Sequence, residues 1–202
     1  LSTWSGLRPL VSDPDAADTA GVSRDHVVNT SASGLVTIAG GKWTTYRKMA
    51  LDGVDEAIRV GGLSAGPSRT IDLPLVGGAG YAPTGAGELQ ERFGLEPDVA
   101  SHLNAAYGDR AEQVAHLAQD EELAARLADG HAYLEAEVVH AVRHEQARSG
   151  VDVLARRMRL AFLDQKASLA AVDRVTELIA AELGWDDARA AADRADTVAY
   201  LV

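Results

Sequence analysis

Residues 35–47 of this chain have the sequence LVTIAGGKWTTYR. The short apolar run over residues 35–39 is rich in β-branched side chains and predicts a strand, which Gly40 and Gly41 then end. Helical spacing after the glycines predicts a helix, through Tyr46, Met49 or Ala50, Val54 and Ile58. Such a joint brings backbone N–H groups close to an anion or a polar ring, because glycine lacks Cβ and the first N–H groups of a helix have no internal partner. The glycines also have a purely steric explanation, since a tight strand–helix joint needs them.

From residue 88 the sequence predicts helices to its end. Gly94 closes one helix and Pro97 opens the next, Gly108 ends that helix, and Asp109 with Glu112 forms a capping-box-like start of another. Apolar stripes at helical spacing predict three further helices: Leu134, Val138 and Val142; Val151, Leu154, Met158 and Phe162; Leu169, Val172, Val175, Ile179 and Leu183. Gly184 and Asp186 are expected to end the last of these and to cap a final helix.

The predicted fold class is therefore mainly α, with a short α+β part followed by a helical bundle. Residues 1–62 form the first domain, with strands over residues 26–28 and 35–39. Residues 63–87 are rich in glycine and proline and are predicted to be a linker. Residues 88–202 form the helical domain.

Composition excludes several classes of protein. The chain has no cysteine, which rules out disulfides and thiolate metal sites, and no apolar run approaches the roughly 20 residues of a membrane-spanning helix. Any membrane contact is therefore expected to be peripheral. Residues 1–62 carry 6 Lys and Arg against 7 Asp and Glu, whereas residues 63–202 carry 13 against 23. This acidic balance argues against nucleic-acid binding, which needs a basic surface.

Four motifs, taken in order, resemble parts of FAD-dependent (quinone-linked, aerobic) glycerol-3-phosphate dehydrogenase: GLRPL at 6–10, VSRDHVV at 22–28, GGKWTTYR at 40–47 and VDVLARRMRLAFLD at 151–164. The resemblance covers nearly the whole chain. It implies that residues 1–62 are the C-terminal end of the FAD/substrate-binding domain and that residues 88–202 are the family's C-terminal α-helical domain. It also implies FAD as the cofactor.

The resemblance assigns the substrate phosphate to three cations. Arg8 and Arg24 are implied to clamp the phosphate of glycerol 3-phosphate, because a guanidinium can bond two phosphate oxygens at once. Lys42 is implied to lie between substrate and flavin. Read without the resemblance, Arg8 is a surface arginine in a turn, Arg24 is a charge on an edge strand and Lys42 is an exposed lysine. A cation at the positive end of a helix dipole is disfavoured, however, which hints at a nearby anion.

The resemblance places the flavin's pyrimidine edge against Gly40, Gly41, Lys42, Trp43 and Thr44. Backbone N–H groups there would stabilise the negative charge that builds on the ring as it accepts a hydride. Trp43 is equally interpretable as a core residue. We assign no catalytic residue within the chain, because none of its six histidines falls in a motif that matches the family's catalytic base, and we assign no metal ligand. The Gly-x-Gly-x-x-Gly motif that holds the ADP half of FAD in the family also has no counterpart here.

The function implied by the resemblance is oxidation of sn-glycerol 3-phosphate to dihydroxyacetone phosphate, with electrons passed through FAD to a quinone. The chain is expected to be a C-terminal fragment that is inactive without the missing N-terminal FAD domain. The protein is expected to be cytoplasmic, with peripheral contact to the inner face of the plasma membrane. A homodimer is the expected assembly. The alternatives are a glycerol-3-phosphate oxidase, with oxygen as the acceptor, and a non-catalytic helical interaction module.

Two further clusters have ordinary explanations. Arg156, Arg157 and Arg159 could form a patch for anionic lipids, but their acidic surroundings favour internal ion pairs. His140 and His144 have the i, i+4 spacing of a metal pair. Without a third ligand or the Glu of a zincin motif, they are interpreted as ordinary helix residues.

Overall fold

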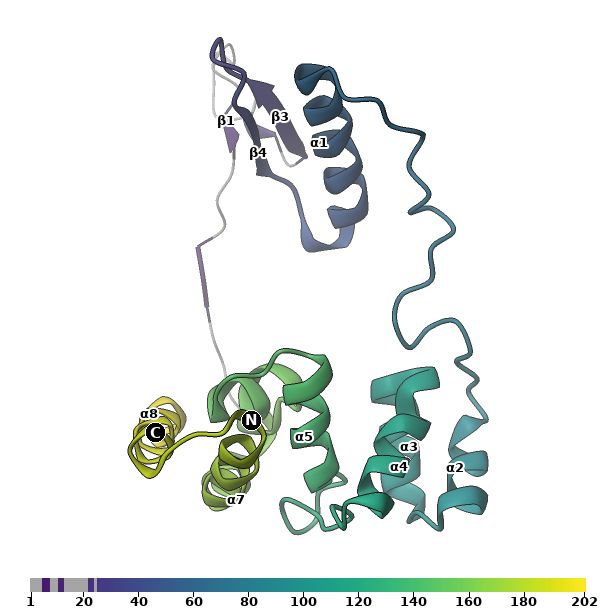
Figure 1. Ribbon diagram of the computed structural model, residues 1–202, viewed down its shortest axis with the longest axis vertical. Coiled ribbons are helices and arrows are strands. Elements are labelled where there is room, and N and C mark those ends of the chain that lie inside the picture. The colour runs from purple at the N-terminus through teal and green to yellow at the C-terminus, as the bar shows by residue number, and fades with distance from the viewer. Residues whose placement is uncertain (1–4, 8–10, 13–21, 24) are drawn as a thin grey trace. The chain divides into compact units, whose positions relative to one another are not determined.

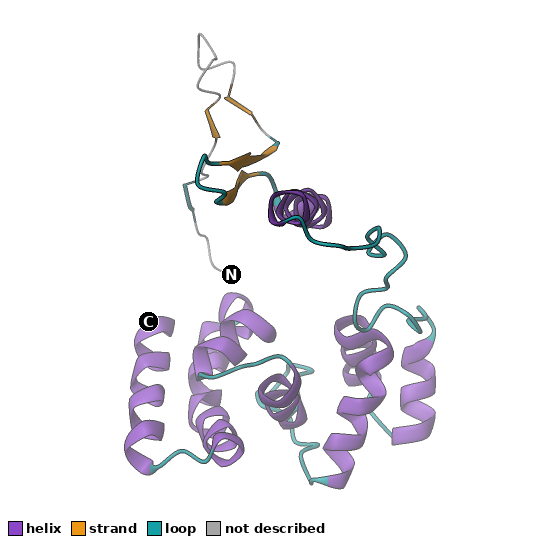
Figure 2. Cartoon of the chain, turned by 45° about the horizontal axis from the view of Figure 1, so that its top comes forward, coloured by secondary structure: helices purple, strands orange, loops and turns teal. Residues whose placement is uncertain are grey.

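The structure is a computed structural model that describes residues 5–7, 11–12, 22–23 and 25–202. The chain divides into two compact units, which we call the N-terminal unit, ending at Leu73, and the helical unit, Pro74–Val202. All strands of the described residues belong to the N-terminal unit (Figure 2). The prediction of a mainly helical fold is confirmed. The domain limits at residues 62 and 87 stay predictions.

The N-terminal unit contains two antiparallel strand pairs and one helix. The two short strands β1, Val11–Ser12, and β2, Val22–Ser23, pair with each other. The strands β3, His26–Thr30, and β4, Val36–Gly40, form a hairpin in which His26 lies opposite Gly40. A short 3-10 turn, Trp43–Thr45 (η2), leads into helix α1, Tyr46–Gly61, which runs beside this hairpin (Figure 1).

Helix α1 approaches the hairpin closely through a glycine. A Cβ on Gly53 would lie 2.1 Å from Cδ1 of Ile38 in β4, so the absence of a side chain lets the helix pack against the strand. Gly53 is the only buried residue of α1. This unit therefore has little apolar core of its own in the part of the chain that the structure describes.

The core lies in the helical unit, whose helices are α2, Gly85–Phe93; α3, Pro97–Tyr107; α4, Ala111–Asp120; α5, Glu135–His144; α6, Leu160–Leu163; α7, Gln165–Leu183; and α8, Asp187–Leu201. Helix α5 is central, between α4 and α7 (Figure 1), and its residues from Glu135 to Val142 are all buried. The predicted stripes on α5 and α7 face this core, with Val138, Val175 and Ile179 fully buried.

Most helix ends are where local sequence signals place them. Gly94 and Gly184 adopt left-handed conformations as the C-caps of α2 and α7. Pro97 opens α3, and the side chain of Asp186 accepts the N–H of Arg189 at the start of α8. The prediction of a capping box at Asp109 is wrong, because Arg110 is the N-cap of α4.

Asp109 instead helps to fix the end of the linker. Its carboxylate accepts the N–H of Gly80 at 2.9 Å, and its own N–H donates to the carbonyl of Gly77 at 3.0 Å. Gly108, at the end of α3, approaches Gly77 so closely that a Cβ on it would lie 1.9 Å from the Gly77 carbonyl oxygen. Residues 64–69 have no helix or strand, and α2 begins only at Gly85.

The stripe from Val151 to Phe162 does not form one helix, so that prediction is wrong. A π-helical turn, Asp152–Arg157 (η4), is followed by Arg159 in the left-handed region at φ +62°, and α6 is a separate short helix. Tertiary contacts outweigh the regular spacing: Arg157 donates to the backbone carbonyl of Glu145, and Asp164 ends α6 and caps α7. Phe162, expected in the stripe, is exposed.

Candidate functional site

The strand–turn–helix joint predicted from the sequence is present at residues 36–61. Gly40 and Gly41 both have positive φ, +76° and +78°, a conformation that favours glycine. The two glycines turn the chain from β4 into η2, so that Lys42 stands at the entrance to the helical segment. The chain therefore presents main-chain groups and a lysine at one sharp turn.

Both glycines also have a packing role. A Cβ on Gly40 would lie 3.0 Å from the carbonyl oxygen of Asp25, and a Cβ on Gly41 would lie 2.6 Å from Sδ of Met49. The steric explanation of the two glycines is thus correct as far as it goes. It does not account for the side chains that follow them.

Lys42 and Trp43 are exposed at this turn. No partner of the Lys42 ammonium exists among the described residues, whereas its backbone carbonyl accepts the hydroxyl of Thr45 at 3.0 Å. Trp43 is 86% exposed and stacks on Tyr46, with ring centroids 5.5 Å apart. In this chain Trp43 is therefore not a core residue. An unpaired cation, an exposed indole and a glycine turn together form a surface suited to a polar aromatic ligand.

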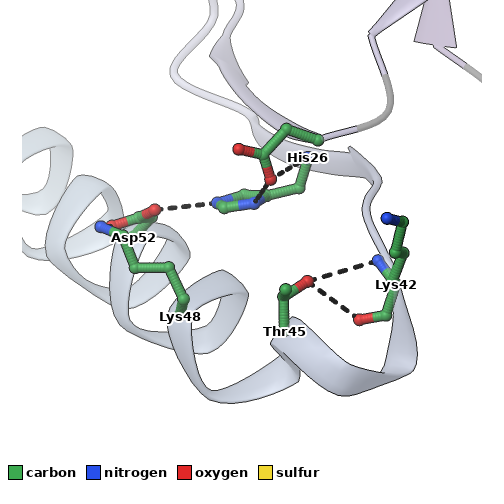
Figure 3. A network of polar contacts seen from close by, with 6 residues as sticks. His26, Lys42, Thr45, Lys48 and Asp52 are labelled. Atoms are coloured by element: carbon green, nitrogen blue, oxygen red, sulfur yellow. Dashed lines mark hydrogen bonds and ion pairs between the residues drawn. The ribbon is translucent and has the colours of Figure 1, made fainter.

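Sequence reasoning missed the histidine that supports this turn. His26, in β3, lies under the glycines, since a Cβ on Gly41 would come within 3.1 Å of its own Cβ. Its Nε2 is 2.8 Å from Oδ2 of Asp52 in α1, and its Nδ1 is 3.0 Å from Oδ1 of Asp25 (Figure 3). The contact between His26 and Asp52 ties the hairpin to the helix that follows the turn.

The hydrogen bonds of this network shift the pKa values of His26 and Asp52 so that each favours its charged form. The hydrogen bond to Asp52, aided by that to Asp25, raises the pKa of His26, although the side chain is only 8% exposed. Lys48 and then His26 hold the pKa of Asp52 below its ordinary value. His26 is therefore favoured as an imidazolium, with both ring N–H groups donating to carboxylates. The i, i+4 pair Lys48 and Asp52 was the signal in the sequence, but nothing local linked it to His26.

The two predicted phosphate ligands, Arg8 and Arg24, lie outside the described residues. Of the predicted site, the structure brings together Gly40, Gly41, Lys42, Trp43 and Thr44, which are consecutive in the chain.

The two helical histidines line a cavity of about 320 Å³ in the helical unit, together with Arg110, Gln113 and Glu145. Gln113 Nε2 lies 2.9 Å from Nε2 of His144. Burial lowers the pKa of His140 to about 4, so this ring is neutral near pH 7. Within the described residues, no three His, Cys, Asp or Glu side chains cluster as metal ligands would.

Comparison with known proteins gives a consistent family. A family model described as the C-terminal domain of alpha-glycerophosphate oxidase matches residues 68–190. The chain is 48% identical over 194 residues to mitochondrial glycerol-3-phosphate dehydrogenase of Bos taurus, covering 94% of this chain and 26% of that protein. It is 49% identical over 192 residues to the protein of the same name from Homo sapiens, covering 93% of this chain and again 26% of the relative.

One solved structure shows the same fold. It is the X-ray structure of glycerol-3-phosphate dehydrogenase from Bacillus halodurans complexed with FAD, with a TM-score of 0.68, 23% identity and coverage of 87% of this chain and 36% of that one. The present chain thus spans about a quarter of the length of the two relatives above. Among the described residues, no helix combines the length and the apolar character needed to cross a bilayer. With the family model matching well over half of its residues, the chain belongs to the family defined by the C-terminal domain of alpha-glycerophosphate oxidase.

Proposed function

We propose that this chain is the C-terminal part of a flavoprotein that oxidises sn-glycerol 3-phosphate to dihydroxyacetone phosphate and passes the electrons through FAD to a quinone. The observation that carries the proposal is the turn at Gly40–Lys42, where two positive-φ glycines present a lysine, unpaired within the part of the chain that the structure describes, beside an exposed tryptophan. The names of the relatives, glycerol-3-phosphate dehydrogenases, support it, as does the FAD with which the Bacillus halodurans enzyme is complexed.

The residues at this turn fit the pyrimidine edge of a flavin. Gly40, Gly41, Trp43 and Thr44 would line the edge with main-chain groups, and Lys42 would add a positive charge. Donors fixed in place before the reaction stabilise developing negative charge without reorganisation. When bound, FAD supplies the hydride acceptor, and the role of this chain is to hold and polarise it.

Arg8, Arg24 and Lys42 are proposed to bind the substrate phosphate. A phosphate monoester carries close to two negative charges near neutral pH. Two guanidinium groups and an ammonium match the charge of the phosphate and its three terminal oxygens. Glycerol has no phosphate and therefore offers neither the charge nor these oxygens. The specificity for a phosphorylated triol would come from these three side chains.

Glycerol-3-phosphate oxidase is the second candidate, because the matching family model is described by that enzyme. The two differ in the electron acceptor. Turnover of the whole enzyme with glycerol 3-phosphate in air, with peroxide formation and reduction of a soluble quinone analogue followed in parallel, separates them. Quinone reduction without stoichiometric peroxide supports the dehydrogenase, and stoichiometric peroxide supports the oxidase.

A quinone acceptor resides in lipid, so peripheral membrane contact by the whole enzyme is part of the same proposal. The sequence-based expectation is a cytoplasmic homodimer at the inner face of the plasma membrane, whereas the relatives above are named as mitochondrial. Co-sedimentation of the whole enzyme with lipid vesicles and its mass in solution test these two points.

The site assignment is tested by Lys42→Ala and Arg8→Ala in the whole enzyme. Arg8→Ala should lower kcat/KM about thirty- to a thousandfold and leave the flavin spectrum unchanged, since a charge-assisted contact contributes about 2–4 kcal/mol in a sheltered site. Lys42→Ala should shift the flavin spectrum or potential as well. Lys166→Ala removes the same charge from an exposed position on α7 and serves as the control. Normal kinetics in Arg8→Ala and an unchanged spectrum in Lys42→Ala would show the assignment to be wrong.

A further inference from the structure

The three arginines of the basic cluster in the helical unit, Arg156, Arg157 and Arg159, differ in their contacts. Arg156 pairs with Asp152 at 2.5 Å. Arg157 donates from Nη2 and Nε to the backbone carbonyl of Glu145, at 2.6 and 3.2 Å. The guanidinium of Arg159 has no hydrogen bond or ion pair with any described residue. The expectation of internal ion pairs is thus correct for Arg156 and for Arg157, whose Nε lies 3.8 Å from Oε2 of Glu145, and it does not extend to Arg159.

The backbone around Arg159 is unusual in two ways. The π-helical turn Asp152–Arg157 precedes it, and Arg159 itself is one of three non-glycine residues with positive φ among those described. π-Helical turns and left-handed non-glycine residues occur disproportionately at functional sites. Here they direct Arg157, Met158 and Arg159 toward one cavity instead of around a regular helix.

That cavity has a volume of about 250 Å³ and is distinct from the flavin turn, since all its lining residues belong to the helical unit. Its lining includes His102 and Tyr107 from α3, Tyr133, Glu137 from α5, Arg157 and Arg159.

The buried carboxylate in the lining of this cavity, that of Glu137, already accepts several hydrogen bonds. Glu137 is 1% exposed. Its Oε1 accepts the N–H of Leu134 at 2.8 Å, and its Oε2 lies 2.8 Å from both His102 Nε2 and the hydroxyl of Tyr107. Three donors satisfy its lone pairs, so Glu137 has little capacity to receive a further donor from a ligand.

Two groups of the lining that can donate have no hydrogen-bond partner among the described residues: the hydroxyl of Tyr133 and the guanidinium of Arg159. Tyr133 is only 9% exposed, yet its hydroxyl has no hydrogen-bond partner among the described residues. Its ring packs edge-on against His102, with centroids 4.7 Å apart, which fixes its position. The guanidinium of Arg159 lines the same cavity.

The lining of the cavity carries two arginines, Arg157 and Arg159, and two carboxylates, Glu137 and Glu145. Glu145 also lines the cavity, with Arg157 Nε 3.8 Å from its Oε2, so these two charges offset each other. Of the two arginines in this lining, Arg157 has a carboxylate partner, whereas Arg159 has none among the described residues.

We propose that this cavity binds a small oxyanion, a phosphate or a carboxylate, held by the guanidinium of Arg159 and the hydroxyl of Tyr133. Arginine suits such a ligand because its planar fork offers two parallel N–H donors. The proposal concerns the helical unit alone, and its outcome is independent of whether the flavin turn acts as proposed above.

The test is titration of the 202-residue chain with inorganic phosphate, and separately with acetate, by calorimetry and amide NMR shifts. Saturable binding of either anion, with shifts at Tyr133 and residues 157–160, is expected, and the tighter anion identifies the source. Arg159→Gly removes the guanidinium and accepts a positive φ without strain, and it should weaken binding at least about tenfold, the equivalent of one charge-assisted contact. Tyr133→Phe should weaken it about threefold or more, as loss of a single neutral hydrogen bond does.

Arg156→Ala is the matched control. It removes the same charge three residues before Arg159, and the side chain of Arg156 does not line the cavity. Its affinity should stay within about twofold of the parent chain, since an exposed charge acts weakly at a distance. Absence of saturable binding of both anions would overturn the proposal. Equal weakening by Arg156→Ala and Arg159→Gly would also overturn it, because that result shows attraction to the basic surface and no specific site.

Discussion

The imidazole of His26 connects three parts of the N-terminal unit: strand β3, the glycine turn and helix α1. Both of its ring nitrogens face carboxylates (Figure 3), and its Cβ would lie 3.1 Å from a Cβ on Gly41, in the turn proposed to contact the flavin. A buried, fully bonded imidazolium resists movement of the turn, because shifting it would leave Asp52 without one of its two partners.

Stability of the N-terminal unit should depend on pH through this network. The folded state raises the pKa of His26 above 6.5, so its contribution is present below about pH 6.5 and is lost as the pH rises through the folded-state pKa. Asp25 and Asp52 have lowered pKa values, so their contribution is lost as the pH falls below about 3.8. Maximal stability is expected between these limits, as measured by NMR-monitored denaturation of α1.

The control for this prediction is His116→Gln, which removes a histidine from α4 in the other unit. His26→Gln should abolish the loss of N-terminal stability above about pH 6.5, and His116→Gln should retain it. If His26→Gln keeps the same alkaline loss, the network does not act as described.

Single residues also show what could be inferred from the sequence alone. The Gly40–Gly41–Lys42 turn was predictable because β-branched residues, glycine and helical spacing are local signals. The pairing of His26 with Asp52 was not, since it depends on α1 returning over the hairpin, 26 residues later in the chain. The roles of Arg8, Arg24 and Lys42 stay predictions.

At the scale of elements, helix ends followed the sequence wherever one residue determines them. Gly94, Pro97, Gly184 and Asp186 act through their own backbone or side chain. The break at Arg159 could not be predicted, because Leu154, Met158 and Phe162 keep helical spacing while distant contacts interrupt the helix. The misplaced cap at Asp109 has the same cause, since its carboxylate bonds to the linker instead of to the helix.

The junction between the linker and α3 gives a prediction at this scale. Gly108→Ala should destabilise the helical unit by about 2 kcal/mol or more, because its Cβ would collide with the Gly77 carbonyl and its φ is +57°. Gly94→Ala is the control, with φ +64° and open space around the added methyl, and should cost about 1 kcal/mol. Urea denaturation followed by circular dichroism compares them. Equal losses would mean that the linker is not held against α3.

Across the whole molecule, the two units differ sharply in burial. Among the described residues, every member of the apolar core cluster belongs to the helical unit, including fully buried Leu103, Leu154 and Ile179. The N-terminal unit leaves large apolar side chains exposed, namely Val27, Leu35, Ile38, Trp43, Tyr46 and Val54. Because apolar burial is the main source of folding free energy, most of the stability of this chain must reside in the helical unit.

Hydrogen exchange should therefore separate the two units. Amides of β3, β4 and α1 should exchange through openings of low free energy, while those of α5 and α7 should approach the free energy of global unfolding of the helical unit. In denaturant, loss of α1 should precede loss of α5 and α7. As a control, Val175→Ala, which opens a cavity in the core, should lower protection throughout the helical unit by about 1–3 kcal/mol and leave α1 unchanged. A single transition shared by α1 and α7, with the protection of both lowered by Val175→Ala, would instead show that the two units unfold as one cooperative body. The helical core would then also stabilise the turn at Gly40–Lys42.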